Sequence, residues 1–308
     1  MYASIIICTY NRANSLARVL DSINMMEVPN DVPWELVIVD NNSRDKTREV
    51  VDEFKSNTRL SIKYVVETKQ GLSVARNCGI SAKSGEIVIF TDDDVVVDKF
   101  WLAEVVGAFR KLDAACIGGK ILPLWQHPPP KWLTKELHCY IALLDYGDEV
   151  LRMGRPMLWG ANFAVRADVF DKYGVFSNEL GRRPGKLYGL EETVLIDQLI
   201  KAGERVFYCP RAVVHHCIPG SRMKKSYFRK WRFHEGEQMA LRSDESGQRK
   251  VFGVRNSMVR HLLGEVKHYL RIVAKRQDNA FIKQLNIISE IGCILQHIRR
   301  RGTSCRVM

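Results

Sequence analysis

Short apolar segments alternate along the first part of the chain with segments whose apolar residues recur at helical spacing. The apolar segments cover residues 4–9, 35–40, 62–66 and 86–90. They are apolar at most positions rather than at every second one, which is typical of strands buried on both faces of a parallel sheet. Helical patterns separate them at residues 16–23, 46–54 and 73–81. This alternation predicts an α/β layered domain with a mostly parallel sheet flanked by helices.

The pattern changes after residue 115. Residues 115–190 are less regular, and a helix then opens at Glu191 and ends at Gly203. Two further strands are expected at residues 205–209 and 212–215. The chain beyond residue 220 consists of basic helical segments. We therefore expect a catalytic or binding domain over residues 1–220 and a basic helical region over residues 221–308.

The distribution of charge supports this division. The 308 residues are 46% hydrophobic and 27% charged, which is ordinary for a globular protein, and the net charge is +12. Residues 1–220 carry a net charge of −1, whereas residues 221–308 carry +13. Such asymmetry indicates that the C-terminal region meets an anionic partner.

Cysteine spacing and hydropathy give expectations about the compartment. The eight cysteines are scattered and form no CxxC pair, so neither a zinc ribbon nor a disulfide framework is indicated. No secretory signal pattern is visible, and no apolar run reaches about 18 residues, the length that favours a transmembrane helix. A cytoplasmic protein is the expectation.

Three aspartates, Asp92, Asp93 and Asp94, follow the strand predicted at residues 86–90. Open α/β sheets bind ligands beyond the carboxyl ends of their strands. In extended chain, alternate residues point the same way, so Asp92 and Asp94 could present two carboxylates to one Mg²⁺ or Mn²⁺ ion, with Asp93 pointing away. The alternative is a solvated acidic turn.

Further polar residues stand at other element ends. Asp40 and Thr9 end predicted strands, and Asp40 is either a turn or capping residue or an acceptor for a nucleobase or ribose. Glu191 and Glu192 open a helix, where acids are favoured by the helix dipole, although either could serve as a general base.

A basic and a histidine-containing segment follow. His215 and His216 are adjacent on a strand, so at most one of them faces the same site as the aspartates. Arg222, with Lys224 and Lys225, either holds a diphosphate or simply begins the basic region.

Six segments in order resemble family 2 glycosyltransferases of the GT-A fold, and the resemblance covers about residues 3–235. The segments are Ile5–Arg12, Val37–Ser43, Gly71–Ile80, Phe90–Asp94, Gly160–Arg166 and Gly189–Glu192. The segment His216–Arg222 is similar to members that assemble bacterial polysaccharides.

The resemblance implies an inverting transfer of a sugar from a nucleotide-diphospho-sugar, expected to be UDP-linked, to a hydroxyl of a glycan or lipid-linked acceptor. It implies a divalent metal, Mn²⁺ or Mg²⁺, held by Asp94 and His216. It assigns the catalytic base to Glu192, with Glu191 as the alternative because the family usually has Glu-Asp there. The residues expected at the nucleotide-sugar are Thr9, Tyr10, Arg12, Asp40, Asn42, Arg76, Asp92, Asp93 and Arg222.

The basic C-terminal region permits two interpretations. Its amphipathic helices either lie on an anionic membrane surface, on the cytoplasmic face of the plasma membrane, or pack on the catalytic domain as a lid. Competing functions are an inactive nucleotide-sugar-binding protein, a nucleotidyltransferase and a nucleic-acid binder. A nucleotidyltransferase should carry a glycine-rich phosphate loop, which residues 10–14 lack, and no nucleic-acid motif is present, so nucleic acid is not an expected partner.

Overall fold

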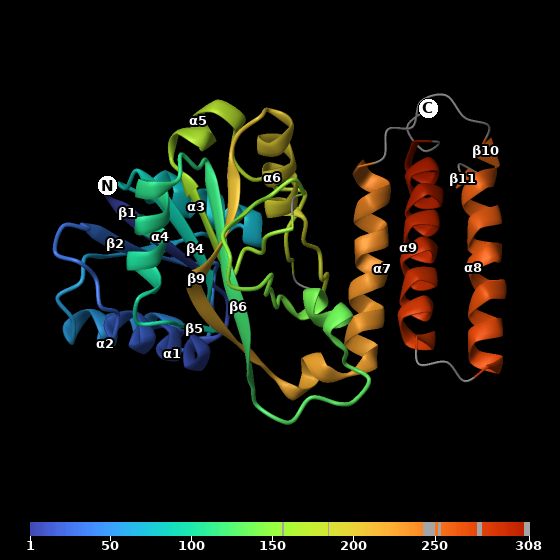
Figure 1. Ribbon diagram of the computed structural model, residues 1–308, viewed down its shortest axis with the longest axis horizontal. Helices are drawn as coiled ribbons and strands as arrows, with labels where there is room; N and C mark the ends of the chain where they lie inside the picture. Colours follow the sequence, from blue (N-terminus) through green and yellow to red (C-terminus); the bar gives the residue numbers. More distant parts are fainter. Residues whose placement is uncertain (156, 184, 243–249, 252–253, 276–278, 305–308) are drawn as a thin grey trace. The chain divides into compact units, whose positions relative to one another are not determined.

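The structure, a computed structural model, describes residues 1–155, 157–183, 185–242, 250–251, 254–275 and 279–304 (Figure 1). The chain divides into two compact units, Met1–Pro184 with Leu190–Pro219, and Gly185–Gly189 with Gly220–Met308. Residues 185–189 thus group with the C-terminal helices, although their sequence neighbours on both sides belong to the first unit.

A single mixed sheet forms the centre of the first unit, with nine strands among the described residues. The strands are β1 (Ala3–Thr9), β2 (Trp34–Asp40), β3 (Ile62–Val66), β4 (Ile87–Asp92), β5 (Val95–Val97), β6 (Cys116–Trp125), β7 (Leu151–Arg152), β8 (Asn162–Arg166) and β9 (Val206–Ile218). Their order is β3-β2-β1-β4-β8-β6-β9-β5, with β7 paired to β9. Strands β1 to β4 pair in parallel, whereas β5, β7 and β8 run antiparallel to their neighbours. The prediction of a mixed sheet is confirmed.

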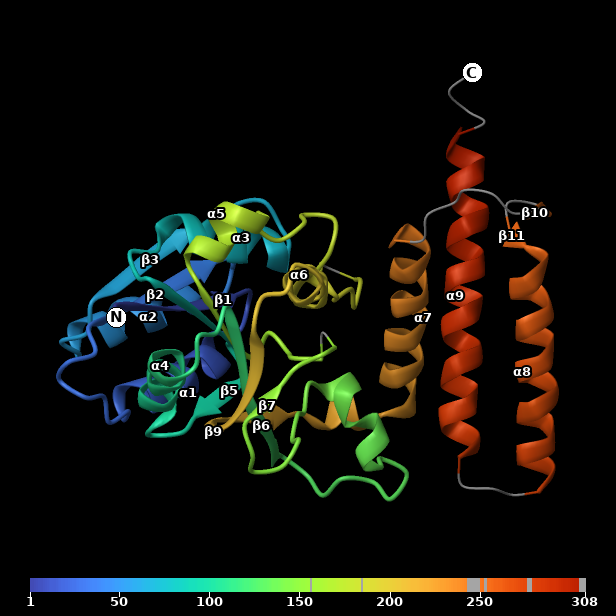
Figure 2. The same cartoon turned by 45° about the horizontal axis from the view of Figure 1, so that its top comes forward.

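Helices flank this sheet on both faces, and α1 and α3 lie on opposite sides of it (Figures 1 and 2). The helices are α1 (Ala13–Asn24), α2 (Thr47–Ser56), α3 (Leu72–Ala82), α4 (Trp101–Lys111), α5 (Asp168–Tyr173) and α6 (Glu191–Lys201), with a 3-10 helix at Lys135–Ile141. In α1 the apolar residues Leu16, Val19, Leu20 and Ile23 are buried, as their spacing predicts. Parallel strands that are covered on both sides must be apolar throughout, which explains the continuous apolar segments.

Strand register brings several polar residues to one edge of the sheet. Thr9 at the end of β1 lies opposite Asp40 at the end of β2, and Cys8 lies opposite Asp92 at the end of β4. The antiparallel neighbours complete this edge, because Thr91 pairs with Asn162 of β8, and Val95 pairs with His216 of β9. Residues far apart in sequence therefore meet beyond the carboxyl ends of β1, β2 and β4.

Strand β9 corrects one prediction. The segments 205–209 and 212–215, expected as two strands, belong to one continuous strand that pairs with β6. Gly119 pairs with Cys209, whereas the next residue of β6, Lys120, pairs with Val213. Residues 210–212 therefore form a bulge, which keeps the strand in the sheet despite Pro210, a residue without a backbone N–H.

The second unit is helical, which confirms the predicted helical extension. It contains α7 (Lys225–Arg242), α8 (Asn256–Ala274) and α9 (Ala280–Ser304), the short strands β10 (Lys250–Val251) and β11 (Val254–Arg255), and a 3-10 turn at Gly220–Met223. Helix α9 packs between α7 and α8 (Figure 1). At Gly236 of α7 a Cβ atom would lie 1.8 Å from the carbonyl oxygen of Ser289, so these two helices approach closely because this residue is glycine. Among the described helices, none is long and apolar enough to cross a membrane.

Candidate active site

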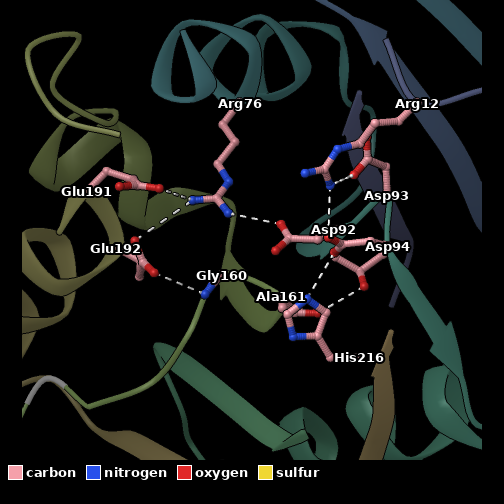
Figure 3. A network of polar contacts seen from close by, with 11 residues as sticks. Arg12, Arg76, Asp92, Asp93, Asp94, Gly160, Ala161, Glu191, Glu192 and His216 are labelled. Carbon is pink, nitrogen blue, oxygen red and sulfur yellow. Dashed lines mark hydrogen bonds and ion pairs between the residues drawn. The ribbon is translucent and has the colours of Figure 1, made fainter. Parts of the chain in front are cut away.

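Arg12 holds Asp93 and Asp94, the two aspartates that follow β4. Its Nη1 lies 2.8 Å from Asp93 Oδ1 and 2.8 Å from Asp94 Oδ2. The Thr9 hydroxyl donates to Asp93 Oδ2 at 2.8 Å. The expected extended triplet was wrong, because Asp93 and Asp94 lie in a turn between β4 and β5. Asp93 therefore does not point away from Asp94 but shares the same guanidinium with it (Figure 3).

This clustering of buried carboxylates has an electrostatic consequence. Asp93 is 5% exposed and Asp94 is 8% exposed. Burial raises the pKa of Asp93 to about 6, with Asp94 adding to the rise and Arg12 opposing it. A site with two buried carboxylates and one guanidinium carries excess negative charge, which a cation would relieve.

His216 and Asp94 form a donor pair suited to a divalent metal. His216 Nε2 lies 3.3 Å from Asp94 Oδ1, and the His216 side chain is 1% exposed. The other ring nitrogen, Nδ1, lies 2.9 Å from the carbonyl oxygen of Ile141. A carbonyl only accepts, so Nδ1 is the nitrogen that donates to it, which leaves Nε2 as the nitrogen that can bind a metal.

The number of protein ligands also fits such an ion. Within the described ranges, no group of three or more His, Cys, Asp or Glu side chains has the geometry to hold a metal. Mg²⁺ is commonly held by only one or two carboxylates together with substrate phosphates, and Mn²⁺ accepts similar ligands. One carboxylate and one imidazole therefore fit an ion whose remaining ligands come from a diphosphate and water.

Arg76, from α3, lies between Asp92 and the two glutamates that open α6 (Figure 3). Its Nη1 is 2.8 Å from Glu191 Oε1 and 3.9 Å from Glu192 Oε2, and its Nη2 is 3.5 Å from Asp92 Oδ1. The Arg76 side chain is 4% exposed, and the rings of Phe90 and Phe176 lie 5.8 and 5.7 Å from its guanidinium carbon. One buried guanidinium thus connects Asp92, at the end of β4, with the glutamates of α6.

The two glutamates differ in their surroundings. Burial and the charge of Glu192 raise the pKa of Glu191 to about 8, with Arg76 opposing the rise. Three carboxylates around one guanidinium would leave excess negative charge, so a proton retained on Glu191 is expected physically. Glu192 is less buried, with a side chain 13% exposed compared with 3% for Glu191. Its Oε1 accepts from the N–H of Gly160 at 3.2 Å.

Three residues of this edge were not among the predicted site residues. The amide of Asn41 accepts from the N–H of Gly71 at 2.9 Å and donates to the carbonyl of Lys69 at 2.8 Å, which fixes the loop before α3. Gly160 approaches the Arg76 guanidinium closely, and Asn162 bonds the carbonyls of Lys120 and Ala212. Gly160 and Asn162 belong to the segment Gly160–Arg166, which carries part of the family resemblance, so their importance could have been inferred from it. Their roles are close packing against Arg76 and hydrogen bonds to backbone carbonyls, which the residue types alone do not predict.

Two of the predicted nucleotide-binding residues, Thr9 and Asp40, pair across the ends of β1 and β2. Asp40 accepts from the Tyr64 hydroxyl at 2.5 Å and from the N–H of Ser43 at 2.8 Å, so its turn-stabilising role is present. Tyr10 is 41% exposed, and Asn42 has a left-handed backbone with φ of 66°. Whether Asp40 also meets a nucleotide stays a prediction.

Arg222 differs from the other predicted nucleotide-binding residues because it belongs to the second unit. It lies in the 3-10 turn Gly220–Met223 of the second unit, where it is 8% exposed. Its assignment to the diphosphate stays a prediction.

The geometry can be compared with known proteins. A family model described as "Glycosyl transferase family 2" matches residues 4–174, more than half of the chain. The chain belongs to glycosyl transferase family 2. The predicted enzyme class, a glycosyltransferase, is confirmed.

Two curated relatives of this glycosyltransferase align over most of their length. Succinoglycan biosynthesis protein ExoM of Rhizobium meliloti is 27% identical over 239 residues, which cover 77% of this chain and 74% of ExoM. Glucosyl-dolichyl phosphate glucuronosyltransferase of Haloferax volcanii is 26% identical over 222 residues, which cover 70% of this chain and 69% of the relative.

A solved structure supports the fold. The mannosyltransferase PcManGT from Pyrobaculum calidifontis, in complex with GDP-Man and Mn²⁺, superposes with a TM-score of 0.60 at 20% identity. The superposition covers 80% of this chain and 65% of that one, so this chain spans slightly under two thirds of the solved protein. The predicted GT-A fold is thereby confirmed.

Proposed function

We propose that this glycosyltransferase moves a sugar, with inversion, from a UDP-linked or other nucleotide-diphospho-sugar to a hydroxyl of a glycan or lipid-linked acceptor in cell-surface polysaccharide assembly. The observation that carries the proposal is the arrangement around Arg76. This buried residue lies between Asp92, on the donor side, and Glu191 with Glu192, on the acceptor side (Figure 3).

The donor side is proposed to hold the nucleotide and the metal. Asp94 and His216 would bind Mn²⁺ or Mg²⁺, which supplies positive charge to the leaving diphosphate as the sugar departs. Arg12 keeps Asp93 and Asp94 in place from the opposite side. Thr9, Tyr10, Asp40 and Asn42 are proposed to contact the nucleoside, and Arg222 the diphosphate.

The acceptor side is proposed to hold the base. A general base must be able to reach the acceptor hydroxyl, and it must be ionised when it accepts the proton. Glu192 is the more exposed glutamate, whereas burial holds the proton on Glu191 and Arg76 fixes its carboxyl group. Glu192 is therefore assigned as the base that takes the proton from the attacking hydroxyl, and Glu191 as the residue that orients Arg76.

The acceptor class rests on the relatives. One is named a succinoglycan biosynthesis protein and another a glucosyl-dolichyl phosphate glucuronosyltransferase, which supports a role in polysaccharide synthesis and a lipid-linked sugar as one candidate acceptor class. A lipid-linked acceptor would require the enzyme to work at the cytoplasmic face of the plasma membrane, with the basic C-terminal helices facing anionic lipid.

A donor screen tests the proposal. Release of nucleoside diphosphate is measured for a panel of nucleotide-sugars with Mn²⁺, Mg²⁺ or chelator, and the anomeric configuration of the product is read by NMR. We expect one donor to be turned over with inversion, and Glu192→Gln and Asp94→Ala to lose most of this turnover. The control is Glu49→Gln, because Glu49 also lies in the first turn of a helix but is exposed. Retained activity in both site variants, or retention of configuration, would contradict the proposal.

A further inference from the structure

Helix α8 carries a row of apolar side chains that the structure leaves exposed. Leu263 and Leu270 are each 59% exposed, Val273 is 46% exposed and Val259 is 42% exposed. With the half-buried Val266, these residues are separated by four, three, four and three positions, which places them on one face of the helix. Aligned exposed aliphatic side chains of this size mark an interaction surface rather than scattered surface residues.

The opposite face of α8 shows which side packs on the rest of the unit. Glu265 pairs with Lys283 of α9 at 2.8 Å, His261 pairs with Glu290 of α9, and Ile272 is 3% exposed. These residues define the side of α8 that faces α9. The apolar row therefore lies on the side of α8 that faces away from α9.

Basic residues run beside the apolar row. Arg260, Lys267 and Arg271 are exposed and are separated by seven and four positions, so they form a second row along the helix. Lys267, Arg271 and Lys275, together with Ile272, also line a hollow of about 530 Å³. Glu265 is the one acidic residue of the α8 sequence, and its charge is compensated by Lys283. The outward side of α8 thus combines aliphatic groups with positive charge.

We propose that α8 is an interfacial helix that docks this enzyme on an anionic phospholipid bilayer. The aliphatic row would enter the boundary between headgroups and acyl chains, and the basic row would meet lipid phosphates, as expected for a helix that lies in the membrane plane. The proposal rests on the proposed function in one respect: a lipid-linked acceptor would explain why the enzyme binds a membrane. A soluble partner protein without an acidic surface would explain the apolar row but not the basic row beside it.

Vesicle co-sedimentation of the full chain tests the proposal. Vesicles of phosphatidylcholine alone are compared with vesicles that also contain phosphatidylglycerol. We expect binding only to the anionic vesicles, and Leu263→Asn combined with Leu270→Asn should weaken it about tenfold or more, since two leucines lose their apolar burial. Lys267→Glu with Arg271→Glu should abolish the preference for anionic lipid.

A matched control separates this effect from general loss of apolar surface. Val150 and Val175 of the first unit are 51% and 53% exposed and lie outside the helical unit, so Val150→Asn with Val175→Asn should bind vesicles as the wild type does. Donor turnover on a soluble acceptor should be unchanged in all these variants, so loss of vesicle binding is distinguishable from failure of the proposed chemistry.

Three outcomes would overturn the assignment. One is wild-type protein that ignores anionic vesicles. Another is a wild-type dimer that the leucine variant dissociates, which would make a second copy the occupant. The third is a leucine variant with a lower unfolding free energy and unchanged vesicle binding, which would mean that the row packs within the protein as a lid.

Discussion

Gly160 offers a sharp test of the role assigned to Arg76. A Cβ atom at Gly160 would lie 2.2 Å from Arg76 Nη2 and 2.8 Å from its Cζ. Contacts this short do not occur, so Gly160→Ala must move the guanidinium or the backbone. The guanidinium has little freedom to move, because the rings of Phe90 and Phe176 lie beside it and Glu191 Oε1 holds it at 2.8 Å.

The expected loss follows from these contacts. Overpacking of a close-packed site costs about 1–3 kcal/mol, and breaking a buried ion pair costs about 3–5 kcal/mol. The Arg76–Glu191 pair should be strained rather than abolished, so we expect the unfolding free energy to fall by about 3 kcal/mol. Turnover should fall by about tenfold or more, because a shifted Arg76 no longer holds the carboxylates on its two sides in the same positions.

Urea denaturation and nucleoside diphosphate release measure the two effects. The control is Gly154→Ala, where an added Cβ meets nothing within 4 Å and should leave both quantities unchanged. The reasoning is refuted if Gly160→Ala changes the unfolding free energy by less than about 0.5 kcal/mol, the range of neutral surface substitutions, and retains full turnover.

Three further predictions concern pH, the helical unit and the metal. Burial raises the pKa of Glu191 from 4.5 to about 8, so the unfolding free energy should decline as pH rises between these two values, where only the folded state keeps the proton. Glu191→Gln should flatten this decline in urea melts. The fully buried Glu237 pairs with Lys186 and Arg299, which are partly exposed and can be hydrated again when the pairs are lost. Glu237→Gln should therefore lower the unfolding free energy of the helical unit by about 1–3 kcal/mol in urea melts. An unchanged unfolding free energy would contradict this prediction. Chelation should abolish donor turnover, and added Mn²⁺ should restore it. His216→Ala should raise the Mn²⁺ concentration needed for half-maximal turnover by about 10- to 100-fold. Turnover in chelator equal to that in Mn²⁺ would contradict the metal assignment.

The first half of the fold was predictable because strands buried on both faces of a sheet must be apolar at nearly every position, a pattern that is visible in the sequence. Strands β1, β2 and β4 are apolar at nearly every position, and the helices between them show regular apolar spacing. Strand β9 was divided in error, since Pro210 and Arg211 resemble a strand end unless the bulge opposite Gly119 is known. Such a bulge depends on the partner strand, which local patterns do not contain.

The candidate site was predictable in composition but not in geometry. The sequence identified the aspartates, the glutamates of α6 and His216, because these residue types stand at element ends. It did not predict the turn that makes Asp93 and Asp94 share Arg12, nor the position of Arg76 between two groups of carboxylates. Both arise from contacts between segments about 80 to 115 residues apart.

The most direct test of the account separates donor binding from chemistry. Titration calorimetry of the preferred nucleotide-sugar with Mn²⁺ is combined with turnover measurements for Asp94→Ala and Glu192→Gln. Asp94→Ala should lose Mn²⁺-dependent donor binding, whereas Glu192→Gln should bind the donor as the wild type does and turn over about 10² to 10⁴ times more slowly, the range typical of a lost general base. We predict that the donor side binds the metal and that the acceptor side carries the general base. Unchanged turnover in Glu192→Gln, together with unchanged Mn²⁺-dependent binding in Asp94→Ala, would contradict this prediction.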